Sequence, residues 1–283
     1  MTALYGVIGD PIAHSLSPLI HNGWIRDHGL DAEYLAMQVQ AGALSSALDT
    51  LKSRNCRGLN ITLPHKEDAF RLCTTVSDRA RSIGAVNTLS FDSDGAWRGD
   101  NTDAPGFRHA VVMAFEGSGF RPFASDRPQR AVLIGAGGAS RAVAYVFGRE
   151  RQNAVFCNRT LRRARSLVDV YAPEAGADVL VADLSDLPHH LESCTYVVNA
   201  TSLGHSGKSV DWPEGRGRLV YDLSYGKAAE AFLEPARLAG WRTVDGLLML
   251  VAQAAVSFEV WFGIRPDMDA GYARAKRTLE GVT

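Results

Sequence analysis

Six short apolar segments follow one another between residues 130 and 246, separated by polar or amphipathic stretches. They read RAVLIG, NAVFCN, ADVLVA, YVVNA, RLVYDLS and RTVDG. Short apolar strands that alternate with helical crossovers are typical of a parallel sheet covered by helices on both faces. We therefore expect residues 106–245 to form a doubly wound, Rossmann-type domain.

A glycine-rich loop follows the first of these strands. The segment VLIGAGGASRAVAYVFG places Gly135, Gly137 and Gly138 between a strand and a helix, with Ser140 where the third glycine of G-x-G-x-x-G would stand. Gly135 permits a tight turn, and the next glycines let backbone N–H groups approach a pyrophosphate at the positive end of the helix. An ordinary glycine-rich turn is the alternative, but the strand before and the helix after favour a dinucleotide site.

The residues after the second strand, NRTLRRARS, indicate which dinucleotide is bound. An acidic residue in this region would select the ribose hydroxyls of NAD, whereas this chain has a run of arginines at a helix start, where the helix dipole disfavours cations. We therefore predict a pocket for the 2′-phosphate of NADP, with Arg159 pairing with the phosphate or stacking on the adenine. For Arg162 and Arg165 a solvated helix face is the alternative. The predicted pocket consists of Asn158, Arg159, Thr160 and Arg163.

The first hundred residues also alternate between strand and helix patterns. Strands are expected at ALYGVIG, AEYLAMQV and GLNITLP, and a hairpin in NTLSFDSDGAWRG turns at Asp94 and Gly95. Helices are expected from Ser17 as N-cap, over about 43–54 and over 105–115. This pattern predicts a mainly parallel α/β domain over 1–105, and the Gly-, Ser- and Pro-rich stretch 116–129 is the best linker candidate.

Four polar motifs lie in this first part: SLSP, NITLPHK, GAVNT and GDNTDAPG. In an extended strand Ile61 and Leu63 would face a core while Asn60 and Thr62 face the other side, and Lys66 follows. Two serine hydroxyls at a helix N-terminus suit a carboxylate. Each motif also has a structural alternative: a solvated surface lysine, helix capping, or turn formation.

Taken together and in this order, the motifs resemble the shikimate dehydrogenase family over nearly the whole chain. The resemblance is carried by GVIGDPIAHSLSP, NITLPHK, GAVNT, DNTDAPG, GAGGASRA, NRT, NATSLG and DGLLMLVAQ. It implies NADPH-dependent reduction of 3-dehydroshikimate to shikimate, in aromatic amino-acid biosynthesis, with Lys66 and Asp103 as the catalytic pair.

The resemblance also implies the residues that bind substrate and cofactor. The substrate would be held by Ser15, Ser17, Asn60, Thr62, Asn87, Tyr225 and Gln253. The cofactor would contact, besides the residues above, Asp78, Ala136, Ala139, Thr201, Leu223, Gly246 and Met249. Since Gln253 can reach a substrate held by the first domain only if its helix packs there, residues 246–283 are expected to return to that domain.

Three positions depart from the family's usual pattern: Gly226-Lys227, where a pair ending in Pro is common, His205, where Met is usual, and Leu248, where Gly is usual. A quinate/shikimate dehydrogenase, often NAD-dependent, or a specialised paralogue is therefore an alternative within the enzyme class. A non-catalytic NADP-binding sensor is an alternative from another class. The intact lysine and aspartate argue against the sensor, because sensing needs neither.

Composition limits the partners and the cellular location that can be expected for this protein. Thirty basic and thirty-one acidic residues give a net charge of −1, so no overall field favours nucleic acid or an anionic membrane. The four cysteines are scattered, without metal-ligand or redox spacing, and the N-terminus lacks the pattern of a signal peptide. We expect a cytoplasmic enzyme that binds a small molecule and no metal, as a monomer or a homodimer.

Overall fold

The computed structural model describes residues 2–91, 95–117, 122–123, 130–171, 177–204 and 210–281. The chain divides into two compact units, Met1–Gly106 with Leu250–Thr283, and Phe107–Met249. The stretch 116–129, expected as a linker, lies instead inside the second unit, and only part of it is described. The composition of this stretch suggested a linker because glycine, serine and proline are frequent in any loop, including a loop within a domain.

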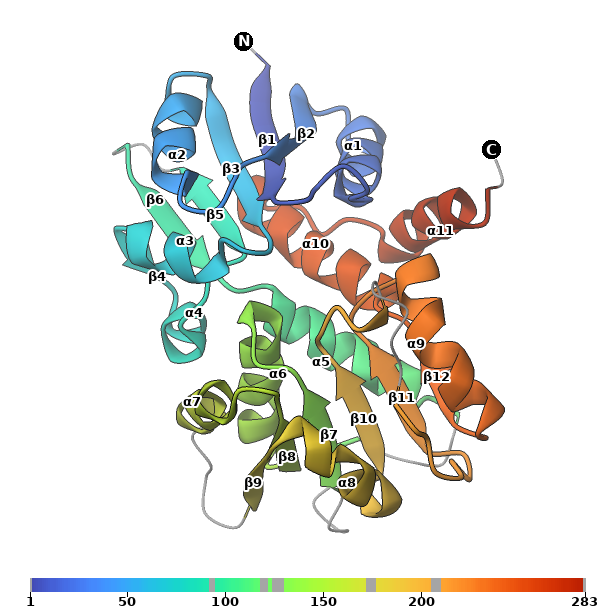
Figure 1. Cartoon of the computed structure of the whole chain (residues 1–283). Coiled ribbons are helices and arrows are strands. Elements are labelled where there is room, and N and C mark those ends of the chain that lie inside the picture. The colour runs from blue at the N-terminus through green and yellow to red at the C-terminus, as the bar shows by residue number, and fades with distance from the viewer. Residues whose placement is uncertain are drawn as a thin grey trace. The chain divides into compact units, whose positions relative to one another are not determined.

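The first unit is built on a six-stranded sheet in the order β2-β1-β3-β5-β6-β4 (Figure 1). The strands are β1 (Ala3–Gly9), β2 (Ala32–Gln38), β3 (Cys56–Ile61), β4 (Thr75–Val76), β5 (Thr88–Phe91) and β6 (Trp97–Asp100). β1 pairs in parallel with β2 and β3, and β4 with β6, whereas β5 runs antiparallel to β3 and β6. The predicted hairpin is thus β5–β6, although Asp94 of its expected turn lies outside the described residues.

Helices cover both faces of this sheet. On one face, the leucines of α2 pack with Ala69 of α3 and Ala80 of α4 against alternate residues of β1 and β3. On the other face, Tyr5 contacts Trp261 and Phe262 of α10, and α11 packs on α1. The helices are α1 (Ser17–Asp27), α2 (Leu44–Lys52), α3 (Lys66–Leu72), α4 (Asp78–Ile83), α10 (Leu247–Phe262) and α11 (Met268–Leu279). The C-terminal helices therefore complete the first unit, as the resemblance implied.

Two local predictions in this unit are wrong. Ser17 is the first residue of α1 rather than its N-cap, which is Leu16, a residue that makes no side-chain capping bond. Leu63 is 68% exposed, because β3 already ends at Ile61 and the strand alternation does not continue past it. Lys66 is accordingly the first residue of α3 and not the end of a strand.

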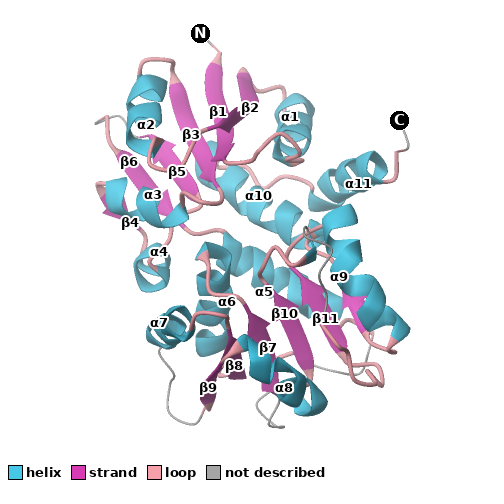
Figure 2. Ribbon diagram, viewed as in Figure 1, coloured by secondary structure: helices cyan, strands magenta, loops and turns pink. Residues whose placement is uncertain are grey.

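The second unit contains six parallel strands in the order β12-β11-β10-β7-β8-β9 (Figure 2). They are β7 (Arg130–Ile134), β8 (Asn153–Cys157), β9 (Val179–Ala182), β10 (Tyr196–Asn199), β11 (Leu219–Asp222) and β12 (Arg242–Val244). Three strands extend to each side of the β7–β10 boundary, which is the order of a doubly wound nucleotide-binding sheet. The predicted Rossmann-type fold is confirmed.

Helices also cover both faces of the second sheet. One face packs against α8 (Leu187–Ser193) and α9 (Lys227–Leu238), with Leu191 and Phe232 in the core. On the other face Phe107 of α5 (Asp103–Ala114) meets Phe147 of α6 (Gly138–Arg149) and Tyr221 of β11. α7 (Leu161–Tyr171) packs beside α6. Among the helices that the structure describes, none is long and apolar enough to cross a membrane.

Candidate active site and nucleotide loop

Lys66 and Asp103 form a largely buried ion pair in the first unit. The Lys66 Nζ donates to Asp103 Oδ2 at 2.6 Å, and the two side chains are 13% and 7% exposed. Each residue begins a helix, α3 and α5 respectively. Both side chains are largely shielded from solvent. Such an ammonium–carboxylate pair can stabilise charge on a neighbouring oxygen atom or transfer a proton to it.

The start of α5 is fixed by the side chains just before Asp103. Asp100 accepts hydrogen bonds from Ser77 Oγ (2.5 Å) and from Arg79 Nη2 (2.7 Å). The next residue, Asn101, caps α5 by accepting the Ala104 N–H at 3.2 Å. The carboxylate that pairs with the lysine is thereby attached to a rigid element rather than to a mobile loop.

Asn87 connects this pair to α10. Its Nδ2 donates to Asp103 Oδ1 (2.9 Å) and to Gln253 Oε1 (3.2 Å), and its Oδ1 accepts the Thr102 N–H (2.6 Å). Gln253 also donates from Nε2 to the Leu250 carbonyl. Tertiary contact therefore brings together Asn87, Asp103 and Gln253, three of the residues assigned to one site by resemblance.

Sheet topology explains why residues so far apart in sequence meet. In the register, Ile8 lies opposite Ile61, Asn60 opposite Thr88, and Thr88 opposite Asp100. The residues that follow β1, β3 and β6 and those that precede β5 consequently meet at one edge of the sheet. That edge carries Ser15, Ser17, Thr62, Lys66, Asn87 and Asp103.

The two serines and Thr62 are placed differently from one another. Ser17 is buried, whereas Ser15 and Thr62 are half-buried, and Ser15 Oγ accepts the Ser17 N–H at 3.3 Å. Asn60 is buried, and its side chain is engaged inside the protein: Oδ1 accepts from the Tyr34 hydroxyl (2.7 Å), and Nδ2 donates to Ser257 Oγ (2.9 Å). Asn60 therefore supports its neighbours as well as bordering the site.

Four buried polar residues beside this site were not predicted from the sequence: Tyr34, Thr88, Thr102 and Ser257. A signal existed for two of them. Thr102 lies within the DNTD motif, and Ser257 is a polar residue, with Gln253 and Glu259, in a strongly apolar helix.

A neutral histidine lies behind this network. His21 is fully buried, and its ring stacks on Tyr34 with the centroids 4.2 Å apart. Within the described part of the chain neither ring nitrogen has a hydrogen-bond partner. Burial lowers the pKa of His21 to about 3, and the nearby Asn60 opposes this shift only in part. Burial also raises the pKa of Tyr34 well above its usual value.

In the second unit, the glycine loop has the geometry that a dinucleotide requires. Gly135 has φ +107°, and a Cβ there would lie 2.8 Å from Thr201 Cγ2, so only glycine fits. Gly137 precedes α6, and a Cβ on it would meet nothing within 4 Å, which leaves open space beside the backbone. Ser140 is buried and accepts the Gly137 N–H at 3.1 Å, which gives the serine at the third-glycine position a capping role.

The predicted phosphate pocket lies between β8 and α7. Arg159, Thr160 and Arg163 are exposed, and Asn158 Nδ2 donates to the Thr160 carbonyl at 3.0 Å, which folds the loop. Within the described residues neither Arg159 nor Arg163 takes part in an ion pair, so both guanidinium groups are free to bind an anion. The residues present therefore fit a dinucleotide that carries a 2′-phosphate.

Further predicted cofactor residues follow the neighbouring parallel strands. Thr201 Oγ1 donates to Asn199 Oδ1 (2.6 Å), and Asn199 Nδ2 donates to the fully buried Asp222 (2.8 Å). A Cβ on Gly246 would lie 2.1 Å from the Leu223 carbonyl oxygen, so the chain after β12 runs directly against the end of β11. Ligands of such sheets bind at the carboxyl ends of the strands, where these residues lie.

The remaining predicted residues are distributed over both units. Tyr225 and Met249 belong to the second unit and are half-buried and buried, whereas Asp78 begins α4 in the first unit. Of the departures from the family pattern, Leu248 is half-buried at the start of α10, Gly226 is the N-cap of α9 with φ 64°, and His205 lies outside the described residues.

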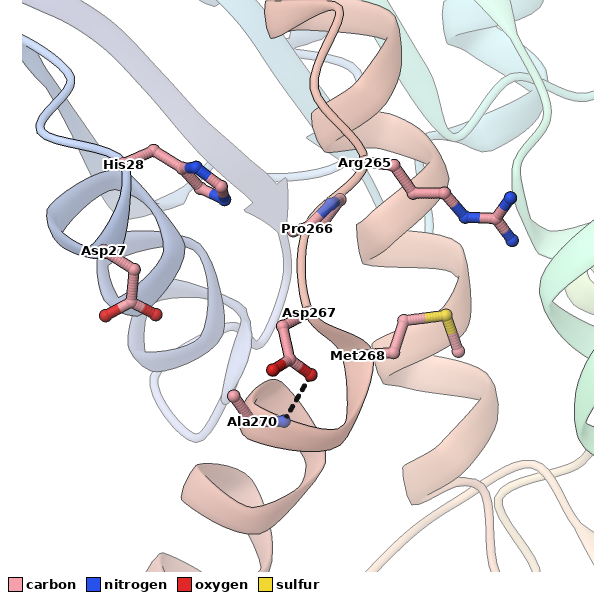
Figure 3. Close-up of a pocket in the computed structure, with 7 residues that line it drawn as sticks. All are labelled: Asp27, His28, Arg265, Pro266, Asp267, Met268 and Ala270. Carbon is pink, nitrogen blue, oxygen red and sulfur yellow. Dashed lines mark hydrogen bonds between the residues drawn. The ribbon is translucent and has the colours of Figure 1, made fainter.

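A separate pocket of about 610 Å³ lies where α1 ends and α11 begins (Figure 3). Its two carboxylates already have structural roles: Asp27 pairs with Arg274, and Asp267 caps α11 by accepting the Ala270 N–H at 3.0 Å. The Arg265 side chain points away from Asp27 and His28. None of the predicted site residues lines this pocket, and among the described residues no cluster of His, Cys, Asp and Glu could hold a metal ion.

Comparison with known proteins places the whole chain in one family. Residues 7–89 match the shikimate dehydrogenase substrate binding domain, 121–206 the shikimate/quinate 5-dehydrogenase model, and 246–276 the shikimate 5′-dehydrogenase C-terminal domain. The shikimate dehydrogenase (NADP(+)) of Hyphomonas neptunium is 50% identical, and the match covers 100% of both chains.

Two solved structures with similar folds are named for different substrates. A shikimate dehydrogenase in complex with NADP+ has a TM-score of 0.84 and 30% identity, covering 98% of this chain and 96% of that one. The quinate dehydrogenase of Corynebacterium glutamicum in complex with NAD has a TM-score of 0.82 and 28% identity, covering 96% and 98%. The fold alone therefore does not separate the two substrates.

A doubly wound sheet with a glycine loop, joined to an α/β unit with a buried Lys–Asp pair, defines the class of two-unit, dinucleotide-dependent α/β dehydrogenases. Within this class, the motifs and the full-length similarity point to one family. The chain belongs to the shikimate dehydrogenase family.

Proposed function

We propose that this protein catalyses the reversible, NADPH-dependent reduction of 3-dehydroshikimate to shikimate in aromatic amino-acid biosynthesis. The observation that carries the proposal is the buried Lys66–Asp103 pair, bonded through Asn87 to Gln253 at one edge of the first sheet. Full-length similarity to relatives named shikimate dehydrogenase (NADP(+)) supports the same reaction.

In this mechanism Lys66 acts on the oxygen of the reacting carbonyl group. NADPH, when bound, supplies the hydride that converts the carbonyl carbon to an alcohol carbon. The Lys66 ammonium stabilises the negative charge that develops on the oxygen and donates a proton to it from Nζ. Asp103 holds that ammonium through Oδ2 and accepts a hydrogen bond from the reacting hydroxyl. In the oxidative direction the same groups receive the proton.

The other residues of the edge orient the substrate. The hydroxyl groups of Ser15 and Ser17, beside the start of α1, bind the carboxylate, and Thr62, Asn87 and Gln253 bind the ring hydroxyls. Tyr225 is the remaining residue that the family resemblance assigns to the substrate. Asn60 and Asn87 also hold their neighbours in place, because both amides are hydrogen-bonded within the protein.

NADP is held by the second unit. The open backbone at Gly137 and the first turn of α6 receive the pyrophosphate, and Arg159 and Arg163 bind the 2′-phosphate. The remaining contacts come from the residues after β10, β11 and β12, with Met249, and from Asp78. We further propose a cytoplasmic location, which the four unpaired cysteines support, and action as a monomer or homodimer without nucleic-acid or membrane partners.

A quinate/shikimate dehydrogenase that uses NAD is the second candidate, because a quinate dehydrogenase matches the fold almost as well. The exposed Arg159 argues against it, since an acidic residue in this region is what selects NAD. A steady-state assay of the purified protein with shikimate and with quinate, each with NADP and with NAD, decides between them. We expect the highest kcat/KM for shikimate with NADP. Absence of turnover with all four combinations would contradict both candidates.

A further inference from the structure

Three hydroxyl groups meet in the interior of the first unit, and we call Thr88, Thr102 and Ser257 the hydroxyl cluster. The Thr88 and Thr102 oxygens lie 3.0 Å apart, those of Thr88 and Ser257 2.8 Å, and those of Thr102 and Ser257 3.0 Å. The three side chains come from β5, from the segment before α5 and from α10, and all are essentially inaccessible to solvent. Buried polar groups must be satisfied by partners inside the protein.

On one side, the cluster fixes the amide of Asn60. Its Nδ2 donates to Ser257 Oγ (2.9 Å) and to Thr88 Oγ1 (3.3 Å), while its Oδ1 accepts from the Tyr34 hydroxyl. This arrangement assigns the nitrogen of the amide to the cluster and the oxygen to Tyr34. The Ser257 hydroxyl in turn can donate to the Gln253 carbonyl at 3.0 Å, one turn earlier in α10.

On the other side, the cluster fixes the amide of Asn87. The Asn87 Nδ2 lies 2.9 Å from Thr102 Oγ1, and the hydroxyls of Thr88 and Thr102 lie 3.1 and 3.2 Å from Asn87 Oδ1. With this orientation the same Nδ2 reaches Asp103 Oδ1 at 2.9 Å. An amide turned the other way would present an oxygen to the carboxylate, which would repel it.

We propose that Ser257 is a positioning residue: through the hydroxyl cluster it holds the Asn87 amide in the orientation that fixes Asp103 and, through Asp103, the Lys66 ammonium. Ser257 itself reaches neither Lys66 nor Asp103 by a hydrogen bond that the described residues show, so its effect on catalysis is indirect. The inference rests on the proposed function, because the Lys66–Asp103 pair is the catalytic pair of that reaction.

The test is a double-mutant cycle of Ser257→Ala with Lys66→Ala, measured with shikimate and NADP. We expect Ser257→Ala alone to lower kcat by roughly five- to fiftyfold, which lies within the range of couplings in one network, with a smaller change in KM. In the Lys66→Ala background the same substitution should change kcat less than twofold, since the residue that it positions is absent. A purely structural serine would lower activity by the same factor in both backgrounds.

Matched variants control for loss of folding. Thr278→Ala removes a comparable bond to the carbonyl four residues earlier, Thr278 Oγ1 to Arg274 O at 3.2 Å on α11, and should leave kcat unchanged. Thr88→Val removes a cluster hydroxyl at constant shape, and Thr88→Ser keeps the hydroxyl, so only the valine variant should reproduce the loss. These two variants decide the matter if Ser257→Ala does not fold.

The outcomes distinguish this inference from the proposed function. A wild-type enzyme without activity on shikimate would remove the function and the inference together. A wild-type enzyme that is active, with Ser257→Ala and Thr88→Val folded and fully active, would leave the function standing and overturn the inference. Equal losses for Ser257→Ala in both backgrounds would overturn it as well.

Discussion

Gly106 and Gln253 approach each other so closely that a Cβ atom on Gly106 would lie 2.8 Å from the Cβ and 2.9 Å from the backbone nitrogen of Gln253. Helices α5 and α10 can approach this closely only because residue 106 has no side chain. The approach brings Gln253 Oε1 to within 3.2 Å of Asn87 Nδ2. A single glycine thus allows a C-terminal helix to reach the edge of the sheet that carries Lys66 and Asp103.

Gly106→Ala should therefore disturb the active site as well as the fold. The added methyl group must push α10 away, which we expect to destabilise the protein by about 1–3 kcal/mol, as overpacking does. The KM for shikimate should rise by more than the KM for NADP, because Gln253 is proposed to bind the substrate and not the cofactor. Denaturant unfolding and steady-state kinetics measure the two effects. If Gly106→Ala had the stability and the KM of the wild type, α10 would have moved to accept the methyl group without a loss of free energy, and the prediction would be wrong.

Lys66→Ala should lower kcat by roughly a hundredfold or more, the scale of a positioned acid–base group, with a much smaller change in the KM for shikimate. Asp103→Asn should also lower kcat and should raise KM more, because Asp103 binds a substrate hydroxyl in the proposed mechanism. The two losses should be less than additive, since the side chains act as one unit. A strong rise in KM for Lys66→Ala at unchanged kcat would make the lysine a binding residue only.

Arg159→Ala should remove most of the preference for NADP over NAD. We expect the wild-type preference to be at least about tenfold, because a charge-assisted bond to the 2′-phosphate contributes that much or more. NAD binding should hardly change. Arg165→Ala, on the same exposed helix start, is the matched control and should leave the preference intact. An equal loss of affinity for both cofactors in Arg159→Ala would instead indicate a role in folding.

His21 should make the protein less stable in acid. Its pKa is about 3 in the folded state and 6.5 as the reference value, so between these pH values the unfolded chain binds a proton that the folded chain excludes. The free energy of unfolding should therefore fall as the pH is lowered from 6.5 toward 3, by up to about 1.4 kcal/mol per pH unit from this residue. Denaturant unfolding at several pH values measures the slope. His21→Phe should have a shallower slope, and an unchanged slope would assign the acid sensitivity to other groups.

The sequence by itself determined the class of fold. The six apolar segments after residue 130 became six parallel strands in doubly wound order, because buried parallel strands require continuous apolar runs that are visible without any tertiary information. Gly135 was also readable, since a tight turn between strand and helix needs a residue that tolerates positive φ. The family was readable from motifs that keep their order along the chain.

Tertiary structure alone decided which side chains meet. Leu63 kept the strand pattern in sequence yet is exposed, because β3 ends two residues earlier, and Ser17 entered its helix instead of capping it. The hydroxyl cluster was not predicted for the same reason: the sequence marks Thr102 and Ser257 one by one, but with Thr88 they become a network only when β5, α5 and α10 pack together. Local pattern reports the conformation of a segment, whereas the partner of a buried hydroxyl is set by contacts across more than 150 residues of chain.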